Sequence, residues 1–175
     1  VITHLQTQQI ETLDLLVHNA GLGYYGPVAT QPVDNIIDLV DVNYRAPVAL
    51  THALVPYLRG GHITFVSSVA TALPTPDYAV YTAAKAALDA FAHNLRMELD
   101  SQDIGVTLLH PGATRTGMHR KANMPGDTSG YAPPEKVAAM IQAASEKHLR
   151  QGTVGFVNTL LRFVGINFAR IVDTA

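Results

Sequence analysis

The sequence contains no cysteine, and this absence excludes several chemistries at once. Without thiols the chain forms no disulfide, no zinc-thiolate site and no cysteine nucleophile, and it lacks the usual mark of a small extracellular domain. The eight histidines are scattered along the chain, and no His-Glu-x-x-His motif occurs. We therefore predict no metal site.

Charged residues are also scarce, at 15% of the 175 residues, whereas apolar residues reach 47%. This balance is typical of a packed globular domain and argues against intrinsic disorder. No stretch of the sequence carries a lysine or arginine cluster of the kind that neutralises phosphates, and the formal net charge is −2, so a nucleic acid partner is not expected. The chain shows no signal-peptide pattern and no uncharged apolar run of the roughly 18 residues that a membrane span needs. We predict a soluble, cytoplasmic protein with a single domain over residues 1–175.

Four short apolar runs predict buried strands, because they are rich in β-branched residues and do not alternate with polar ones. They lie at 13–18, 62–67, 106–110 and 153–157. The longer segments between them have apolar residues at helical spacing, which predicts helices at 32–58, 78–99 and 134–149, with a kink at Pro47 in the first. Strands that alternate with long helices predict an α/β fold with a parallel sheet.

The stretch 112–134 shows no such periodicity and is rich in glycine, proline, threonine and serine. It is too long to be an ordinary connection in a compact domain. We therefore predict a mobile loop that borders a substrate or a cofactor.

Tyr81 and Lys85 are four residues apart on the predicted helix 78–99, so their side chains leave the same face of that helix. A free phenol titrates near pH 10, and a cation beside it would lower its pKa toward the range of a useful general acid or base. By itself, the pattern also fits two residues at a helix surface. Ser67 and Ser68 strengthen the functional interpretation, because they come at the carboxyl end of a predicted strand, where open parallel sheets bind ligands. A serine there either donates a hydrogen bond to a substrate oxygen or only satisfies the strand end.

Two more strand ends carry small residues, at 18–21 (His-Asn-Ala-Gly) and at 110–116 (His-Pro-Gly-Ala-Thr-Arg-Thr). Glycine and other small residues let a ligand approach the backbone closely, although they also suit ordinary turns.

Together these segments resemble the short-chain dehydrogenases/reductases, and the resemblance covers essentially the whole chain. It rests on LDLLVHNAG at 13–21, on Asn43 in VDVNYRAP, on ITFVSS followed by YTAAK, and on LLHPGATRT. The resemblance implies an NAD(P)-dependent oxidoreductase that interconverts an alcohol and a carbonyl of a small, apolar molecule by hydride transfer. It also implies that the present strands are the fourth to seventh of a doubly wound, Rossmann-like parallel sheet, and that the complete protein is a homo-oligomer.

The same resemblance implies a role for each site residue. Tyr81 would be the catalytic acid/base, and Lys85 would lower its pKa and hold the nicotinamide ribose. Ser68 would orient the substrate carbonyl, and Asn43 would anchor a water-linked proton relay. NAD or NADP would lie against Tyr81, Lys85 and a further set of residues: Asn19, Ala20, Gly21, Pro111, Gly112, Thr114 and Thr116.

The sequence departs from the family pattern near its start. Only 17 residues precede His18, so the glycine-rich phosphate-binding turn expected some tens of residues earlier is absent, and His18 replaces the usual asparagine. Residues 21–26 match Gly-x-Gly-x-x-Gly, but Pro27 and further loop follow where a helix N-terminus should bind pyrophosphate. We interpret the chain, which begins at Val1, as a fragment of a longer enzyme.

Two alternatives to this enzyme remain. One is a truncated, non-catalytic half-fold that acts as an interaction module, exposes a strand edge and binds no NAD(P)H saturably. The other is a serine hydrolase that uses Ser68, although no Gly-x-Ser-x-Gly surrounds that residue. The apolar stretch 156–172 is either a cap or core helix, or a surface for lipid-like molecules.

Overall fold

The structure is a computed structural model and describes residues 1–153. Within them, four strands form a parallel sheet in the order β1-β2-β3-β4. The strands are β1 (Leu15–His18), β2 (His62–Val66), β3 (Gly105–His110) and β4 (Gln151–Thr153). The predicted strand 153–157 extends beyond the described residues, and the stretch 156–172 lies outside them.

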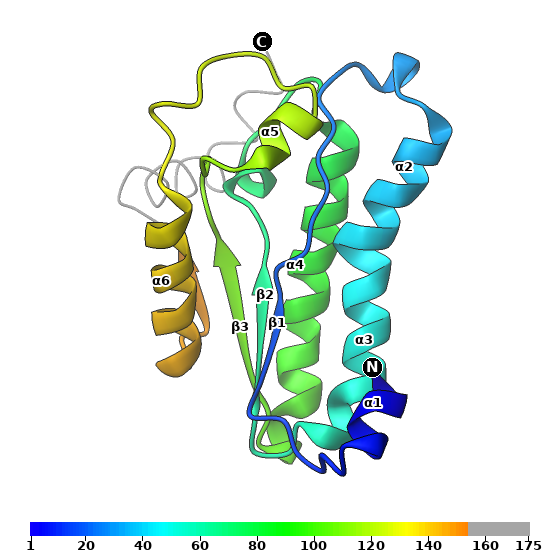
Figure 1. Cartoon of the computed structure of the whole chain (residues 1–175), viewed down its shortest axis with the longest axis vertical. Helices are drawn as coiled ribbons and strands as arrows, with labels where there is room; N and C mark the ends of the chain where they lie inside the picture. The colour runs from blue at the N-terminus through cyan, green and yellow to red at the C-terminus, as the bar shows by residue number, and fades with distance from the viewer. Residues whose placement is uncertain (154–175) are drawn as a thin grey trace.

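Helices cover both faces of this sheet, with α6 on one face and α4 with its neighbours on the other (Figure 1). The α-helices are α1 (Ile2–Thr7), α2 (Val33–Val40), α3 (Ala46–Leu54), α4 (Ala79–Leu99), α5 (Gly117–Lys121) and α6 (Pro134–Glu146). Single turns complete the described chain: η1 (Val28–Thr30), η2 (Asp41–Arg45), η3 (Val55–Tyr57), η4 (Val69–Ala72) and η5 (Asp100–Gln102). The arrangement confirms the predicted doubly wound α/β class. No helix in residues 1–153 is long and apolar enough to cross a bilayer.

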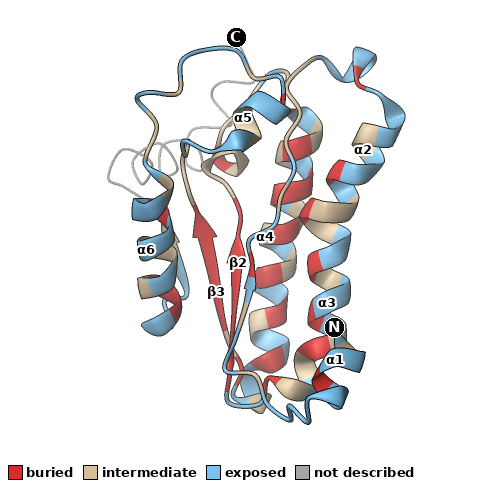
Figure 2. Cartoon of the chain, in the orientation of Figure 1, coloured by how far each residue is buried: buried red, intermediate tan, exposed pale blue. Residues whose placement is uncertain are grey.

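The core lies between the sheet and α4, where Figure 2 shows the buried faces of both. All five residues of β2 are buried, as predicted for a strand with neighbours on both sides, and these include the polar His62 and Thr64. Phe65 on β2 is paired in register with Leu108 on β3, and both are fully buried. Leu88 and Leu95 of α4 are part of the same core, so the apolar stripe of this helix fixes which side faces the pocket.

The predicted helix 32–58 is divided into α2 and α3 by the turn η2, and the predicted kink at Pro47 stays a prediction. The five residues of η2 form a π-type turn between α2 and α3, ahead of the proline. Pro47 lies in the first turn of α3, where a missing N–H is tolerated. A π-turn rotates the following side chains relative to a regular helix, and Asn43 lies within this one.

The segment 112–134 is more ordered than its composition predicts. It contains α5, whose first turn is capped by the Thr116 hydroxyl accepting from the Met118 amide, and Thr114 pairs with Ala132 in an isolated parallel bridge. A helix of five residues is too short to leave a periodic signal in the sequence. The mobility of this segment stays a prediction.

Residues 21–26 are followed by the short turn η1, and α2 begins only at Val33. The motif is therefore not followed directly by a helix N-terminus. A Cβ at Gly23 would lie 2.9 Å from the Tyr78 hydroxyl, so this glycine allows close packing against a tyrosine.

Candidate active site

A pocket of about 690 Å³ opens at the carboxyl ends of β1, β2 and β3. The three strand ends meet there because parallel strands end at the same edge of a sheet. The pocket brings together all but one of the predicted site residues: Asn19, Ala20, Gly21, Ser68, Tyr81, Lys85, Pro111, Gly112, Thr114 and Thr116. The exception is Asn43, which lies behind Gly21. Segments that are up to about 100 residues apart in sequence thus form one site.

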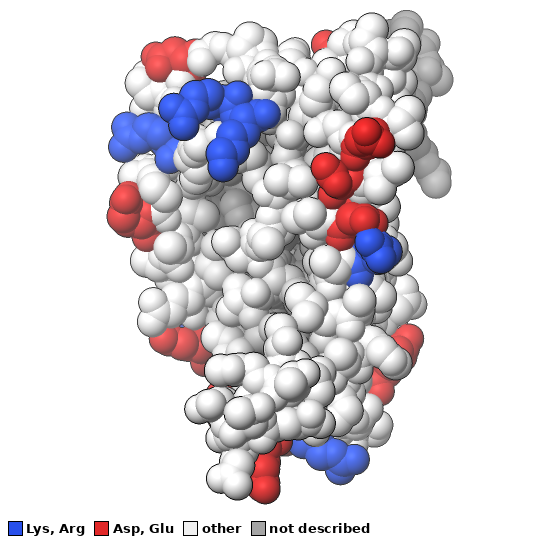
Figure 3. Space-filling view, turned by 45° about the vertical axis from the view of Figure 1, so that its right-hand side comes forward, with Lys and Arg blue, Asp and Glu red and all other residues white. Residues whose placement is uncertain are grey.

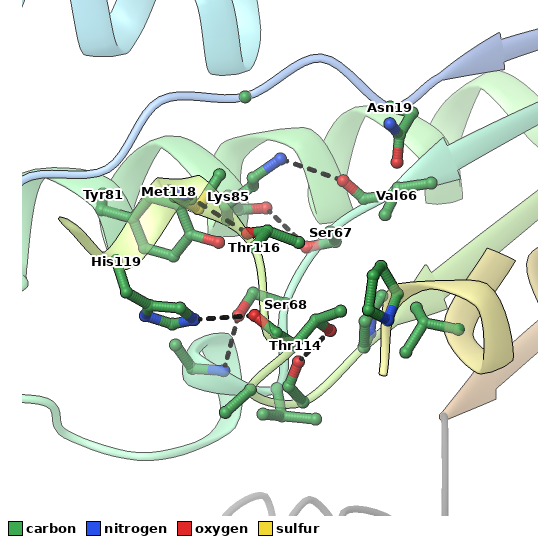
Figure 4. Close-up of a pocket in the computed structure, with 18 of the residues that line it drawn as sticks. Asn19, Val66, Ser67, Ser68, Tyr81, Lys85, Thr114, Thr116, Met118 and His119 are labelled. Atoms are coloured by element: carbon green, nitrogen blue, oxygen red, sulfur yellow. Dashed lines mark hydrogen bonds between the residues drawn. The ribbon is translucent and has the colours of Figure 1, made fainter. Parts of the chain in front are cut away.

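Tyr81 is on the first turn of α4, and its phenol points into the pocket (Figure 4). Its side chain is buried, and burial raises the pKa of the phenol, while a hydrogen bond with Ser68 acts in the opposite direction. Tyr81 is therefore a neutral phenol at pH 7 and holds a proton that it can donate.

Lys85 follows one turn later on α4 and is only 4% exposed. Its Nζ donates a hydrogen bond to the carbonyl oxygen of Val66 at 2.9 Å, at the end of β2 (Figure 4). Burial lowers the pKa of Lys85 to about 8, against the charge of Asp89, which raises it. The sequence predicts that the Lys85 ammonium lowers the pKa of Tyr81. This stays a prediction, because the ammonium donates its hydrogen bond to the Val66 carbonyl oxygen of β2.

Ser68 caps the turn η4, where its hydroxyl oxygen accepts a hydrogen bond from the Ala70 amide at 3.2 Å. The same hydroxyl faces Tyr81 at the pocket. Ser68 therefore satisfies the end of the strand and also lies where it could reach a substrate oxygen, which are the two alternatives that the sequence offered. Within residues 1–153 no hydrogen bond joins the Ser68 hydroxyl to a histidine. The histidine that lines the pocket, His119, has its Nε2 3.1 Å from the Thr114 carbonyl oxygen instead. The geometry does not favour a serine hydrolase.

Asn43 is fully buried, and its amide bonds the backbone of Leu22 in both directions. Gly21 lies directly against it, since a Cβ there would be 3.0 Å from Asn43 Oδ1 and 3.5 Å from Lys85 Nζ. The missing side chain at position 21 thus keeps the backbone open toward the lysine.

His18, at the end of β1, is buried beside this site. Its Nε2 is 2.9 Å from the Thr51 hydroxyl, and its ring stacks on Phe65 with the centroids 4.9 Å apart. Burial lowers the pKa of His18 to about 4, so the ring is neutral at pH 7. The position taken by asparagine in the family is used here for packing.

Sequence reasoning missed the residues that line the rest of the pocket. Tyr78 packs its ring 4.4 Å from that of Tyr81, and burial raises its pKa. Others come from the turn η4 and the loop after it, from segment 112–134 and from α6: Val69, Ala70, Leu73, Thr75, Met118, His119, Met124, Val137, Ala138 and Ile141. The apolar stripe of α6 was the available signal for the last three, but a stripe does not tell which cavity it faces.

The surface charges add one further observation. Figure 3 shows several lysine and arginine side chains gathered at the upper left of this view, with further basic groups at its right side and lower end and acidic groups between them. Arg120 and Lys121 at the end of α5 are exposed. No group of three acidic or histidine ligands for a metal ion occurs in the described part of the chain.

The comparisons with known proteins agree with this geometry. The family model for short chain dehydrogenases matches residues 2–125. A dehydrogenase/reductase SDR family member 7B from Xenopus laevis is 36% identical over 162 residues, which are 85% of this chain and 50% of the relative. A dehydrogenase/reductase SDR family protein 7-like from Drosophila melanogaster is 38% identical over 130 residues, 73% of this chain and 40% of the relative. The chain thus spans about half the length of such relatives or less.

Solved structures share the fold. A short-chain dehydrogenase from Streptomyces avermitilis superposes with a TM-score of 0.81 at 25% identity, over 98% of this chain and 71% of that one. A short chain dehydrogenase from Burkholderia cenocepacia, solved in complex with NADP, gives a TM-score of 0.82 at 24% identity, over 95% of this chain and 70% of that one.

Proposed function

Because the chain belongs to the short-chain dehydrogenase family, we propose that it carries the catalytic residues of an NAD(P)-dependent oxidoreductase that interconverts an alcohol and a carbonyl. The observation that carries the proposal is the meeting of Tyr81, Ser68 and Lys85 in one pocket at the carboxyl edge of a parallel sheet. The activity is proposed for the whole protein, since this chain spans about half the length of a relative such as the one from Xenopus laevis.

In carbonyl reduction, the substrate oxygen would lie between the hydroxyls of Ser68 and Tyr81. Ser68 would donate a hydrogen bond that orients the carbonyl, and Tyr81 would give its phenolic proton to the oxygen as negative charge develops there. The raised pKa of Tyr81 supports this direction, because the phenol keeps its proton until the oxygen becomes basic enough to accept it. The ammonium of Lys85 would stabilise the phenolate that remains.

The chain's residues fit a nicotinamide cofactor, which when bound supplies the hydride. Gly21 leaves room beside Lys85, and the backbone at Pro111 and Gly112 borders the same pocket. Asn19, Ala20, Thr114 and Thr116 would hold the cofactor from the two outer strand ends. Both NAD and NADP are proposed, since the neighbouring structures include a 4-hydroxyisoleucine dehydrogenase with NADH and the Burkholderia protein with NADP.

The lining of the pocket supports a largely apolar substrate. Tyr78, Met118, Met124 and Val137 place aromatic, thioether and aliphatic groups around the hydroxyls of Tyr81 and Ser68. A carbonyl compound with an apolar body would bury it against these groups and leave its oxygen to the two hydroxyls.

The experiment is a titration of the full-length protein with NADH and NADPH by calorimetry, followed by the loss of NAD(P)H fluorescence with a panel of apolar ketones and aldehydes. We expect saturable binding of one cofactor and turnover with part of the panel. A full-length protein that binds neither cofactor would contradict the proposal and favour the non-catalytic interaction module.

A further inference from the structure

Asp89 lies one turn beyond Lys85 on α4, outside the residues that line the pocket, and its carboxylate joins three segments of the fold. Nε2 of His110, at the end of β3, is 2.9 Å from Asp89 Oδ2. The Thr71 hydroxyl, on the turn η4, is also 2.9 Å from this oxygen. A hydrogen bond from Ser67 reaches the same carboxylate. Asp89 therefore connects α4, β3 and the segment that carries Ser68.

These contacts fix the backbone around Ser68. The Thr71 hydroxyl is 3.0 Å from the Ser68 carbonyl oxygen as well as bonded to Asp89. The Ser67 hydroxyl is 3.4 Å from the Lys85 carbonyl oxygen. The residues on both sides of Ser68 are thus tied to the helix turn that presents Lys85, and Asp89 is the acceptor that they share.

The carboxylate is also a charge close to Lys85. Burial opposes its ionisation, but the hydrogen bond and the charge interaction with His110, together with hydrogen bonds from Ser67 and Thr71, hold the pKa of Asp89 below its ordinary value. His110 is fully buried, and its Nδ1 has no hydrogen-bond partner in residues 1–153. Asp89 is therefore an ionised carboxylate at pH 7.

We propose that Asp89 is a positioning residue of this site, which keeps the buried Lys85 charged and holds the segment around Ser68 against α4. The inference rests on the proposed oxidoreductase function. Lys85 is nearly excluded from water, and a buried ammonium needs a compensating charge to stay protonated. Asp89 is the carboxylate that acts on it.

Other titratable groups lie on α4 and on the elements packed against it. Tyr81 and the exposed His93 are on α4 itself, and His110 comes from β3. The turn η2 brings Asp41 and Arg45, which pair with each other at the surface, and α2 brings Asp34 and Asp38. The turn η4 contributes hydroxyl groups, and η5 contributes Asp100 at the far end of α4. The test therefore measures the protonation of Lys85 itself, so that the effect of Asp89 on Lys85 is distinguished from the effects of these other groups.

The test is an NMR titration of the full chain labelled with ¹³C at lysine Cε. The chain has four lysines, and Lys121, Lys136 and Lys147 are exposed and serve as internal controls. The resonance that is missing from the spectrum of the Lys85→Met variant is the resonance of Lys85. We expect Asp89→Asn to lower the titration midpoint of Lys85 by roughly one pH unit, and Asp89→Glu to restore most of it. Thr71→Val, which keeps the carboxylate, should leave the midpoint within a few tenths of a pH unit.

A Lys85 midpoint that is the same in the wild type and in Asp89→Asn would overturn the proposal. If Asp89→Asn does not fold, the wild type decides through its aspartate ¹³Cγ resonances, because an Asp89 carboxyl that is protonated at pH 7 would also overturn it. These readouts need no turnover, so they remain informative if the proposed function fails. In an active enzyme, Asp89→Asn should move the alkaline limb of the kcat/KM profile down by the same amount as the Lys85 midpoint.

Discussion

The side-chain amide of Asn43 is bonded twice to the backbone of Leu22: its Nδ2 donates to the Leu22 carbonyl at 2.8 Å, and its Oδ1 accepts from the Leu22 amide at 3.0 Å. The π-turn between α2 and α3 presents Asn43 in this position, behind Gly21. The pair holds the loop after β1 against the helices. The proton relay proposed for Asn43 stays a prediction, because both polar atoms are already used here.

Asn43→Ala should lower the free energy of unfolding by about 2 kcal/mol or more, because it leaves two backbone groups of Leu22 without partners. Urea denaturation followed by circular dichroism measures this. The control is Asn94→Ala on the exposed part of α4, where the amide bonds only its own helix and the change should stay within about 0.5 kcal/mol. Equal stability of the two variants would show that the Leu22 contact contributes little.

Tyr81→Phe in the full-length enzyme should reduce kcat by at least about a hundredfold, because it removes the proton that the reaction transfers. The fold and the cofactor affinity should be nearly unchanged. Tyr78→Phe is the matched control, since it removes the same atom from the neighbouring ring, and it should keep turnover within about tenfold. Turnover near the wild-type rate in Tyr81→Phe would refute the assignment.

Lys85→Met should impair both kcat and cofactor affinity, since its ammonium is proposed to serve the phenol and the ribose together. Steady-state kinetics and calorimetric titration with NAD(P)H separate the two effects. Lys121→Met, at an exposed position on α5, supplies the control and should change neither. An effect on the rate alone would mean that the ribose role of Lys85 is wrong.

The stability of the fold should fall with acidity through His18. Its pKa is about 4 in the folded chain and 6.5 for an unperturbed histidine, so the unfolded chain binds the proton more readily. The contribution of the neutral ring is complete above about pH 6.5 and is lost as the pH falls toward 4, by on the order of 2 kcal/mol. His62 titrates in the same direction, with a pKa lowered to about 4 by burial and nearby charges.

Urea unfolding at a series of pH values tests this relation. The stability of His18→Asn should decline less steeply between pH 7 and 4 than that of the wild type. The same substitution at His52, which is exposed on α3, should leave the slope unchanged. Identical slopes in all three proteins would rule out His18 as a source of the acid sensitivity.

The complete protein should be a homo-oligomer that pairs through α3 and α4, because their outer faces carry small residues: Ala46, Ala49, Ala53, Ala87 and Ala90. Phe91 was also expected on this outer face, and this was wrong, because its ring packs edge-on against Phe65 in the core. Ala49, Leu50 and Ala90 are exposed in the isolated chain, which supports this proposal. Ala90→Arg should convert the oligomer to monomers in multi-angle light scattering, while Glu98→Arg, exposed nearer the end of α4, should not. A strict monomer in the wild-type protein would count against the proposal.

Local sequence patterns determined the α/β class, the first three strands and the long helix α4, whereas β4 begins two residues before the strand predicted at 153–157. The apolar run at 62–67 predicted a buried parallel strand, and all of β2 is buried. The four-residue spacing of Tyr81 and Lys85 placed both side chains at one pocket, because this spacing is one helical turn. Such features depend on residues close in sequence, so the sequence alone predicts them.

The tertiary structure decided what those residues touch. Lys85 donates to Val66 on another element, and Tyr81 is surrounded by enough protein to raise its pKa. Asp89 meets His110 although 21 residues separate them, and the π-turn that places Asn43 left no trace in the apolar pattern. Contacts, burial and proton affinity depend on which surfaces pack together, and packing sums interactions over the whole chain, so no short segment of sequence contains them.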